Sequence, residues 1–221
     1  ALGGPRERVF TIRADEGTNE AVHPVSVGLE IAGGGASIPL ASGRPDALFD
    51  NDGQITKRPV RALTLSALAP KHGEHLWDIG GGSGSIAIEW LLSHPSLSAT
   101  SFEINPDRAA RITENADSFG LTLSVVSGAA PKALEGQSAP NAIFIGGGIS
   151  EDMLAWIWAN IPKGTRLVAN GVTLEAEALI AKWHADKGGD LMRIELSQSN
   201  PLGRKRGWKS SYPIVQWSVI L

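Results

Sequence analysis

The stretch Leu76-Trp-Asp-Ile-Gly-Gly-Gly-Ser-Gly-Ser85 decides the fold of this 221-residue chain. It joins a predicted strand at residues 75–79 to a predicted helix at residues 83–92. Glycines at such a junction let the backbone turn sharply and approach a bound molecule closely. The dinucleotide-binding pattern G-x-G-x-x-G is not met, because Ser85 stands where its third glycine would be. The spacing is instead Asp78-x-Gly80-x-Gly82-x-Gly84.

Strands and helices alternate on both sides of this glycine loop. The stretch from Thr56 to Leu63 opens another predicted helix, with Pro59 near its first turn. Further helices are predicted after Asn105, Ser150 and Thr173 and at residues 131–134; Asn105 and Ser150 are capping residues, whereas Thr173 could equally be a functional group. Alternation of this kind predicts a mostly parallel sheet with helices on both faces. The last two strands have no helix between them, so we expect an antiparallel C-terminal hairpin. The predicted strands are residues 75–79, 99–103, 121–126, 142–145, 166–169, 191–197 and 214–221.

Composition narrows the classes of protein to which the chain can belong. Its net charge of −3 and pI near 6.0 lack the basic excess of a duplex-DNA binder, so we do not expect a nucleic-acid partner. The sequence contains no run of about 18 apolar residues, so no membrane span is predicted. The chain has no cysteine, which excludes disulfides, zinc–thiolate sites and thiol catalysis and agrees with a cytoplasmic protein.

Residues 1–48 differ in character from the rest of the chain. They are rich in glycine and proline, and their one convincing predicted strand is residues 25–31. We interpret residues 1–48 as a linker or the tail of a preceding domain. We place the α/β domain at residues 49–221.

A carboxylate follows the glycine loop at the distance expected for a nucleotide-type ligand. Glu103 ends the second strand and can accept hydrogen bonds from both hydroxyls of a ribose. An NAD enzyme would place an acid similarly, but the glycine spacing and the C-terminal hairpin resemble those of class I S-adenosylmethionine methyltransferases. That resemblance implies a Rossmann-like α/β fold with a mostly parallel seven-stranded sheet and S-adenosylmethionine as cofactor. The alternatives are a tight structural turn for the glycines and a solvated strand end for Glu103.

The substrate should lie outside the carboxyl ends of the strands, beside the cofactor. Gly146, Gly147 and Gly148 leave space there, and Asn170 ends the fifth strand. The predicted loop 200–209 carries four cations, Arg204, Lys205, Arg206 and Lys209, which with Lys57 could recognise an anionic ligand. A flexible turn and a solvated loop are the alternatives. His72 and His75 have no evident third ligand, so we expect no metal.

Several stretches together resemble one family. They are Leu48-Phe-Asp-Asn-Asp-Gly-Gln-Ile-Thr-Lys57, Val60-Arg-Ala-Leu63, the glycine loop with Ile88-Glu-Trp90, Phe144-Ile-Gly-Gly-Gly148, and Arg166-Leu-Val-Ala-Asn170 with Val172-Thr-Leu-Glu175. The chain from Phe49 onward is similar to the decarboxylating C15-methyltransferases of cobalamin biosynthesis. In some organisms such an enzyme is the C-terminal half of a precorrin-6Y C5,15-methyltransferase. Residues 1–31 resemble the end of its C5-methylating half, which implies that this domain is a partner in a longer chain.

The resemblance implies a precorrin substrate, methylation at C15 and decarboxylation of the ring C acetate. It implies a homo-oligomer, since relatives are tetramers, and it places Thr56, Ala129 and Ala130 near the cofactor. The family often has an acid at the positions of Ala129 and Asn141, so the adenine contacts must differ here. With the glycine loop, the expected cofactor residues are Thr56, Asp78, Gly80, Gly81, Gly82, Ser83, Gly84, Glu103, Ala129 and Ala130. No catalytic residue is predicted. Two other functions stay open: a tRNA base methyltransferase and a non-catalytic, cofactor-binding scaffold.

Overall fold

The computed structural model describes the chain except residues 1–2, 6, 14, 17–25, 33 and 35–36. Contacts divide the chain into two compact units, Ala1–Ser37 and Ile38–Leu221. The described residues of the first unit form turns and irregular backbone only. The strand expected at residues 25–31 is therefore wrong for residues 26–31, whose apolar side chains are exposed and meet no strand in the described part of the unit. Val25 lies outside the described residues.

The second unit begins earlier than the boundary that we expected between residues 48 and 49. Contacts assign residues 38–48 to the larger unit. Arg44 is 3% exposed and contacts Glu89. A short 3₁₀ helix, η1 (Asp46–Leu48), precedes the buried Phe49. Part of the stretch that we interpreted as a linker therefore packs on the α/β domain.

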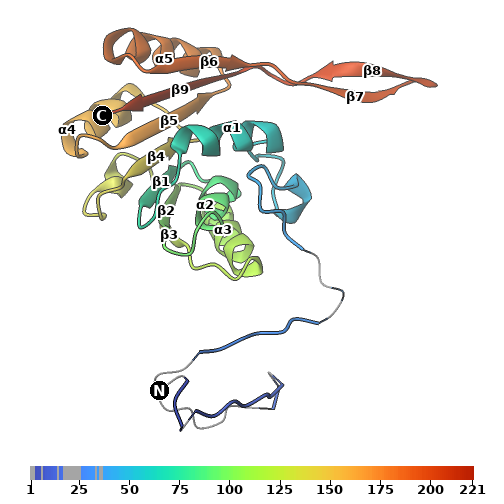
Figure 1. Ribbon diagram of the computed structural model, residues 1–221. Helices are drawn as coiled ribbons and strands as arrows, with labels where there is room; N and C mark the ends of the chain where they lie inside the picture. The colour runs from blue at the N-terminus through green and yellow to red at the C-terminus, as the bar shows by residue number, and fades with distance from the viewer. Residues whose placement is uncertain (1–2, 6, 14, 17–25, 33, 35–36) are drawn as a thin grey trace. The chain divides into compact units, whose positions relative to one another are not determined.

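A seven-stranded sheet lies at the centre of the second unit (Figure 1). Its order is β3-β2-β1-β4-β5-β9-β6. Strands β1 to β5 are parallel, whereas β9 is antiparallel to both β5 and β6. This order, with its antiparallel C-terminal pair, confirms the predicted class I methyltransferase fold. The strands are β1 (His75–Ile79), β2 (Ser98–Glu103), β3 (Ser124–Ser127), β4 (Ala142–Ile145), β5 (Arg166–Gly171), β6 (Asp190–Ile194) and β9 (Ile214–Ile220).

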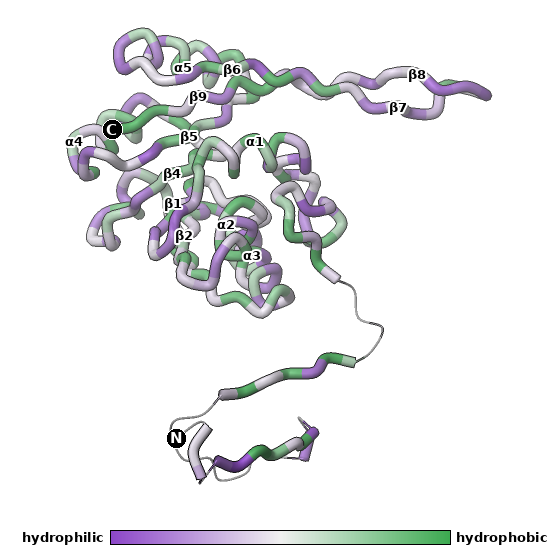
Figure 2. The backbone as a smooth tube through the Cα atoms, in the orientation of Figure 1, coloured by the Kyte–Doolittle hydropathy of each residue, from purple (hydrophilic) through white to green (hydrophobic). Residues whose placement is uncertain are grey.

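Helices cover both faces of the sheet because successive strand side chains point to opposite sides. Leu76 belongs to the core on the face of α1 and α2, and its neighbour Trp77 belongs to the core on the face of α4 and α5. The central strand β4, with the sequence Ala-Ile-Phe-Ile, is buried and hydrophobic along its whole length (Figure 2). The helices are α1 (Arg58–Leu68), α2 (Ser85–Leu91), α3 (Pro106–Ser118), η2 (Lys132–Leu134), α4 (Glu151–Asn160) and α5 (Leu174–Lys187).

The predicted helix starts are confirmed by their caps. The Asn105 side chain accepts the backbone N–H of Asp107 at 2.9 Å, and Ser150 and Thr173 cap α4 and α5 in the same way. These caps satisfy N–H groups that have no partner within the helix.

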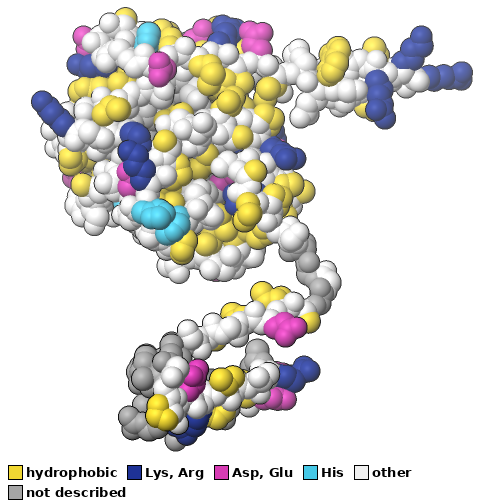
Figure 3. All heavy atoms as spheres, in the orientation of Figure 1, with side chains coloured by type: hydrophobic (Ala, Val, Ile, Leu, Met, Phe, Trp, Pro, Cys, Tyr) yellow, Lys and Arg dark blue, Asp and Glu magenta, His cyan; other side chains and the backbone are white. Residues whose placement is uncertain are grey.

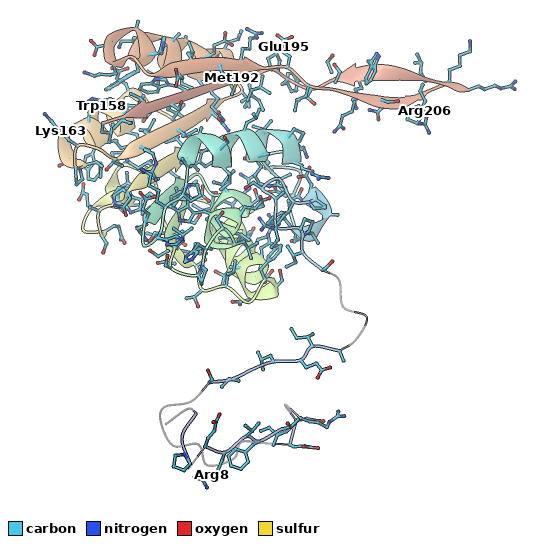
Figure 4. All side chains as sticks on the ribbon, in the orientation of Figure 1. Arg8, Trp158, Lys163, Met192, Glu195 and Arg206 are labelled. Atoms are coloured by element: carbon cyan, nitrogen blue, oxygen red, sulfur yellow. The ribbon has the colours of Figure 1, made fainter. Side chains whose placement is uncertain are left out.

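The predicted loop 200–209 is wrong, because these residues belong to a second, two-stranded sheet. Strands β7 (Ser197–Leu202) and β8 (Lys205–Ser210) pair antiparallel, and Gly203 supplies the positive φ, +59°, of the tight turn. The hairpin projects beyond the central sheet (Figure 1). Basic side chains gather at its free end in Figure 3, and Figure 4 labels Arg206 there.

Candidate active site

A cleft of about 1460 Å³ opens at the carboxyl edge of the parallel strands, where such sheets bind their ligands. One part of its wall is the four loops that follow β1, β2, β3 and β4. The opposite wall comes from the chain before α1 and from the base of the β7–β8 hairpin. The lining includes residues 53–57, 80–83, 102–104, 128–130, 146–148 and 209–214.

The glycine loop needs its glycines for two reasons. Gly80, Gly82 and Gly84 have φ angles of +73°, +61° and +73°, which side chains rarely adopt. A Cβ on Gly80 would also lie 2.8 Å from the backbone of Gly147, so two glycine-rich loops touch and form one floor. A Cβ on Gly82 would meet only carbonyl oxygens, the nearest being that of Gln54 at 3.5 Å. Gly82 therefore keeps open the part of the cleft that it lines.

Glu103 is held rigidly at the end of β2. One carboxylate oxygen accepts the N–H of Gly82 at 2.9 Å, and the other accepts the N–H of Asn105 at 2.9 Å. Each oxygen keeps a second lone pair. Because Glu103 also lines the cleft, those lone pairs are acceptors for a ligand with neighbouring hydroxyl groups.

The chain before α1 is fastened to the domain by a buried ion cluster. We name residues 43–57 the N-terminal strap. The Glu89 carboxylate of α2, fully buried, accepts the N–H groups of Gly43 at 2.7 Å and Arg44 at 2.8 Å. It also accepts Nε of Arg61, on α1, at 2.7 Å. The start of the strap is thus tied to the two helices that support the cleft.

Helix α3 fastens the middle of the strap to the glycine loop. Asn115, 4% exposed, accepts the N–H of Asp50 at 2.9 Å and donates to the carbonyls of Asp50 and Ser83, both at 2.9 Å. Arg108 donates to Asp52 at 2.8 Å, and this contact holds the pKa of the Asp52 carboxyl below its usual range. These contacts fix the position of residues 53–57, the part of the strap that lines the cleft.

Asp78 lies beneath the glycine loop and does not line the cleft. Its side chain is 1% exposed. Burial raises the pKa of Asp78 to about 7, and the negative charge of Glu103 adds to the rise. The carboxyl group therefore titrates near neutral pH.

Asp78 should make stability depend on pH in a way that an Asp78→Asn variant does not. The folded pKa of the Asp78 carboxyl, about 7, lies above its unfolded value of 3.8, so the folded protein holds this proton more tightly than the unfolded chain does. The contribution of Asp78 to the free energy of unfolding is therefore fully present below pH 3.8 and is lost as the pH rises through 7. Between pH 4 and 8 we expect the wild type to lose up to about 4 kcal/mol of unfolding free energy relative to Asp78→Asn. Urea unfolding of both proteins across this range measures the difference. A constant difference would contradict the assignment.

Comparison with known proteins identifies the family. Residues 47–221 match the family model described as a precorrin methyltransferase domain. The chain belongs to this family. Its cleft and glycine loop are therefore those of a precorrin methyltransferase domain.

Two curated relatives and one solved structure illustrate the match. The chain is 55% identical over 224 residues to the decarboxylating precorrin-6Y C(5,15)-methyltransferase of Sinorhizobium sp, covering 99% of this chain and 54% of the relative. It is 34% identical over 167 residues to the decarboxylating cobalt-precorrin-6B C(15)-methyltransferase of Salmonella typhimurium, covering 72% of this chain and 85% of the relative. The C-terminal domain of precorrin-6Y C5,15-methyltransferase from Rhodobacter capsulatus superposes with a TM-score of 0.81 at 49% identity, covering 83% and 100% of the two chains. The chain spans about half the length of the Sinorhizobium relative.

S-adenosylmethionine, the cofactor of this methyltransferase fold, fits the residues of the cleft. Gly82 leaves room above the loop, and Glu103 presents acceptors suited to the ribose hydroxyls. Ala129 and Ala130 offer a small apolar surface to an adenine. The expected cofactor residues that line the cleft are Thr56, Gly80, Gly81, Gly82, Ser83, Glu103, Ala129 and Ala130. Asp78 and Gly84 lie outside the lining and support the loop.

The expected substrate residues divide into two groups. Those that line the cleft are Lys57, Gly146, Gly147, Gly148, Asn170 and Lys209. Arg204, Lys205 and Arg206 lie outside the lining, and their part in binding the substrate stays a prediction. The pairing of Leu202 with Lys205 places these three cations at the tip of the hairpin, whereas Lys209 lies nearer its base.

Sequence reasoning missed several residues of the wall. Gln54 and Ile55 line the cleft from the strap, and Arg108 lines it from α3. Tyr212 lines it from the segment before β9, and Ile214 lines it as the first residue of β9. The only available signal was the family resemblance of the stretch before Lys57. The others are ordinary residue types whose place depends on how distant segments pack.

The described part of the chain carries no group of three or more His, Asp or Glu residues arranged for a metal ion. Within the same part, no helix has both the length and the apolar character that crossing a membrane requires.

Proposed function

We propose that this domain transfers the methyl group of S-adenosylmethionine to C15 of a precorrin and releases carbon dioxide from the ring C acetate. The cleft carries the proposal, because it joins a cofactor half built on Gly82 and Glu103 to a half that bears Lys57 and Lys209. A precorrin is a flat macrocycle with many carboxylates, which suits such a half. The names of the Sinorhizobium and Salmonella relatives, which describe decarboxylating methyltransferases, support the same reaction.

The proposed reaction depends on the alignment of substrate and cofactor more than on a general base. The bond from the acetate methylene to its carboxylate breaks, the macrocycle conducts the electron pair, and C15 forms a bond to the methyl carbon. S-adenosylmethionine, when bound, would supply that methyl as an electrophile: its sulfur–methyl bond would break as the new bond forms, and the sulfur would keep the electron pair as the neutral thioether of S-adenosylhomocysteine. Charge balances without net uptake or release of a proton, so holding the two carbons in line is the main requirement.

The residues of the cleft have distinct parts in this proposal. Lys57 and Lys209 neutralise carboxylates of the substrate and orient it. A Cβ on Gly147 would meet nothing within 4 Å, so the loop after β4 leaves room for a flat ring beside the cofactor half. Thr56 brings the strap to the side of the cofactor.

We also propose that the domain works within a longer enzyme whose N-terminal part methylates C5, and as a homo-oligomer. This chain covers 54% of the Sinorhizobium relative, which supports a longer enzyme that contains this domain. The homo-oligomer rests on the family resemblance.

Mass spectrometry of the product tests the proposal. Precorrin-6B or a C5-methylated precorrin, each incubated with this chain and S-adenosylmethionine, should yield a product whose mass differs by about +14 for the methyl and about −44 for carbon dioxide. A matched reaction without S-adenosylmethionine shows whether decarboxylation occurs alone. Cofactor binding with no mass change would contradict the proposal for this chain. Methylation of tRNA in its place would favour the base methyltransferase, and turnover of neither would favour the scaffold.

A further inference from the structure

Three polar side chains from three elements meet beside the cleft. Asn170 on β5 is the cross-strand neighbour of Gln216 on β9, and Thr64 lies on the α1 helix that covers this face. The Asn170 amide nitrogen donates to the Thr64 hydroxyl oxygen at 3.1 Å. The Gln216 amide nitrogen donates to the same oxygen at 3.0 Å and to the Asn170 carbonyl oxygen at 2.9 Å. Gln216 is 3% exposed and Thr64 is fully buried.

The network permits one orientation of the Asn170 amide. If Asn170 alone were turned over, its NH₂ group would face the NH₂ group of Gln216. If both amides were turned over, the Thr64 hydroxyl would have to donate to two oxygens with its single hydrogen. In the observed arrangement the Thr64 oxygen accepts both bonds, and all three contacts pair a donor with an acceptor. Because two of the three groups are buried, the cost of a mismatched arrangement is high.

This orientation leaves one N–H of the Asn170 amide without a partner in the network. The Asn170 NH₂ group uses one N–H on Thr64 and keeps the other, whereas both N–H groups of Gln216 are used. Asn170 is half-buried and lines the cleft. The cleft lining also includes Lys57 and Lys209, and its acid, Glu103, is already held by two backbone N–H groups. An N–H donor in a cleft lined by two lysines suits an anionic oxygen of a ligand.

We infer that Gln216 and Thr64 are positioning residues that fix Asn170 with an N–H toward the cleft, where it binds a carboxylate of the substrate. The inference rests on the proposed function for the identity of that substrate. It assigns a role to two buried residues that touch neither substrate nor cofactor. Their effect passes through the direction in which the Asn170 amide points.

Steady-state kinetics test the role, with whichever of precorrin-6B and its C5-methylated form the wild type converts. Asn170→Ala removes the donor and should raise the substrate KM about tenfold or more. Gln216→Glu keeps the shape but replaces a donor with an acceptor, so neither orientation of the Asn170 amide is fully paired and its N–H is no longer held toward the cleft; we expect KM to rise about threefold or more. Gln216→Met keeps the volume without fixing either orientation and should raise KM about threefold. The affinity for S-adenosylmethionine should stay unchanged in all three variants.

A matched control separates this role from a general disturbance of the sheet. Ser218 lies two residues further along β9, on the same side, and lines a groove away from the cleft. Ser218→Ala should leave both constants unchanged. An unchanged substrate KM in Asn170→Ala and in the Gln216 variants overturns the inference. Equal losses of substrate and cofactor affinity also overturn it, since they indicate a merely structural role.

The orientation itself can be tested without any substrate. In ¹⁵N–¹H spectra of the wild type, the Gln216 side-chain NH₂ should exchange with solvent about tenfold or more slowly than that of the exposed Gln137. The protection should fall in Thr64→Val, which removes the shared acceptor. An unprotected Gln216 amide overturns the inference. A wild type that does not convert a precorrin defeats the proposed function instead, and the spectra still report on Asn170.

Discussion

A Gly82→Asp variant is expected to fold and to lose about 100-fold or more of its affinity for S-adenosylmethionine. A Cβ at Gly82 would touch only carbonyl oxygens, at 3.5 Å and beyond, so a side chain there enters the open cleft and fills the space above the loop. Its carboxylate would also stand beside Glu103, which accepts the Gly82 N–H. The φ of +61° costs an aspartate about 1 kcal/mol, little enough for the fold to survive. Calorimetric titration and thermal unfolding measure the two effects.

Gly136→Asp is the matched control for backbone strain. Gly136 has a φ of +73°, is exposed, lies outside the cleft lining, and a Cβ there would meet nothing within 4 Å. It should lose similar stability and no cofactor affinity. Undiminished affinity in Gly82→Asp would refute the cofactor assignment, as would an equal loss in the control.

The second large effect is on stability, at the buried ion cluster under the strap. We expect Arg61→Ala to lower the free energy of unfolding by about 3–5 kcal/mol. The Arg61 and Glu89 side chains are both fully buried, with Nε and Oε1 2.7 Å apart. Removing the guanidinium leaves a charged carboxylate with Arg44, 3.3 Å away, as the remaining cation of the cluster. It also removes the donors to the carbonyls of Arg44 and Thr56 and to the carboxylate of Asp46, so the strap loses three attachments.

Urea unfolding monitored by tryptophan fluorescence measures this loss. Arg193→Ala is the control, because Arg193 also makes two ion pairs, with Glu177 and Glu195, but its side chain is 53% exposed. Solvent screens such pairs, so the control should lose less than about 1 kcal/mol. Equal losses in the two variants would mean that the cluster does not fasten the strap as described.

The order of strands and helices could be predicted because local signals mark it. The bounds of β1, β4 and α5 agree with the predicted residues 75–79, 142–145 and 174–187. The Asn105 cap and the glycine loop are equally local, since their conformation depends on neighbouring residues. Glu103 followed from its distance along the chain to that loop. These features needed no knowledge of tertiary contacts.

Other parts of the site depend on residues that are far apart in the sequence. Thr64 and Gln216, 152 residues apart, are ordinary polar residues of a helix and a strand until the fold brings them together. The basic stretch carries charges suited to an anionic ligand, but the turn at Gly203 sends most of them to the hairpin tip. Composition gives the charge of a segment and not its direction.

The N-terminal strap changes what can be removed from this protein without harm. It reads as a connector, rich in small and polar residues, yet Gly43 and Arg44 supply N–H groups to a buried carboxylate and residues 53–57 form a wall of the cleft. A truncation at the first residue of α1 would therefore delete the wall formed by residues 53–57 together with the apparent tether. A boundary placed before Gly43 would keep both the buried attachment and the wall, so a shortened form of this domain should begin there.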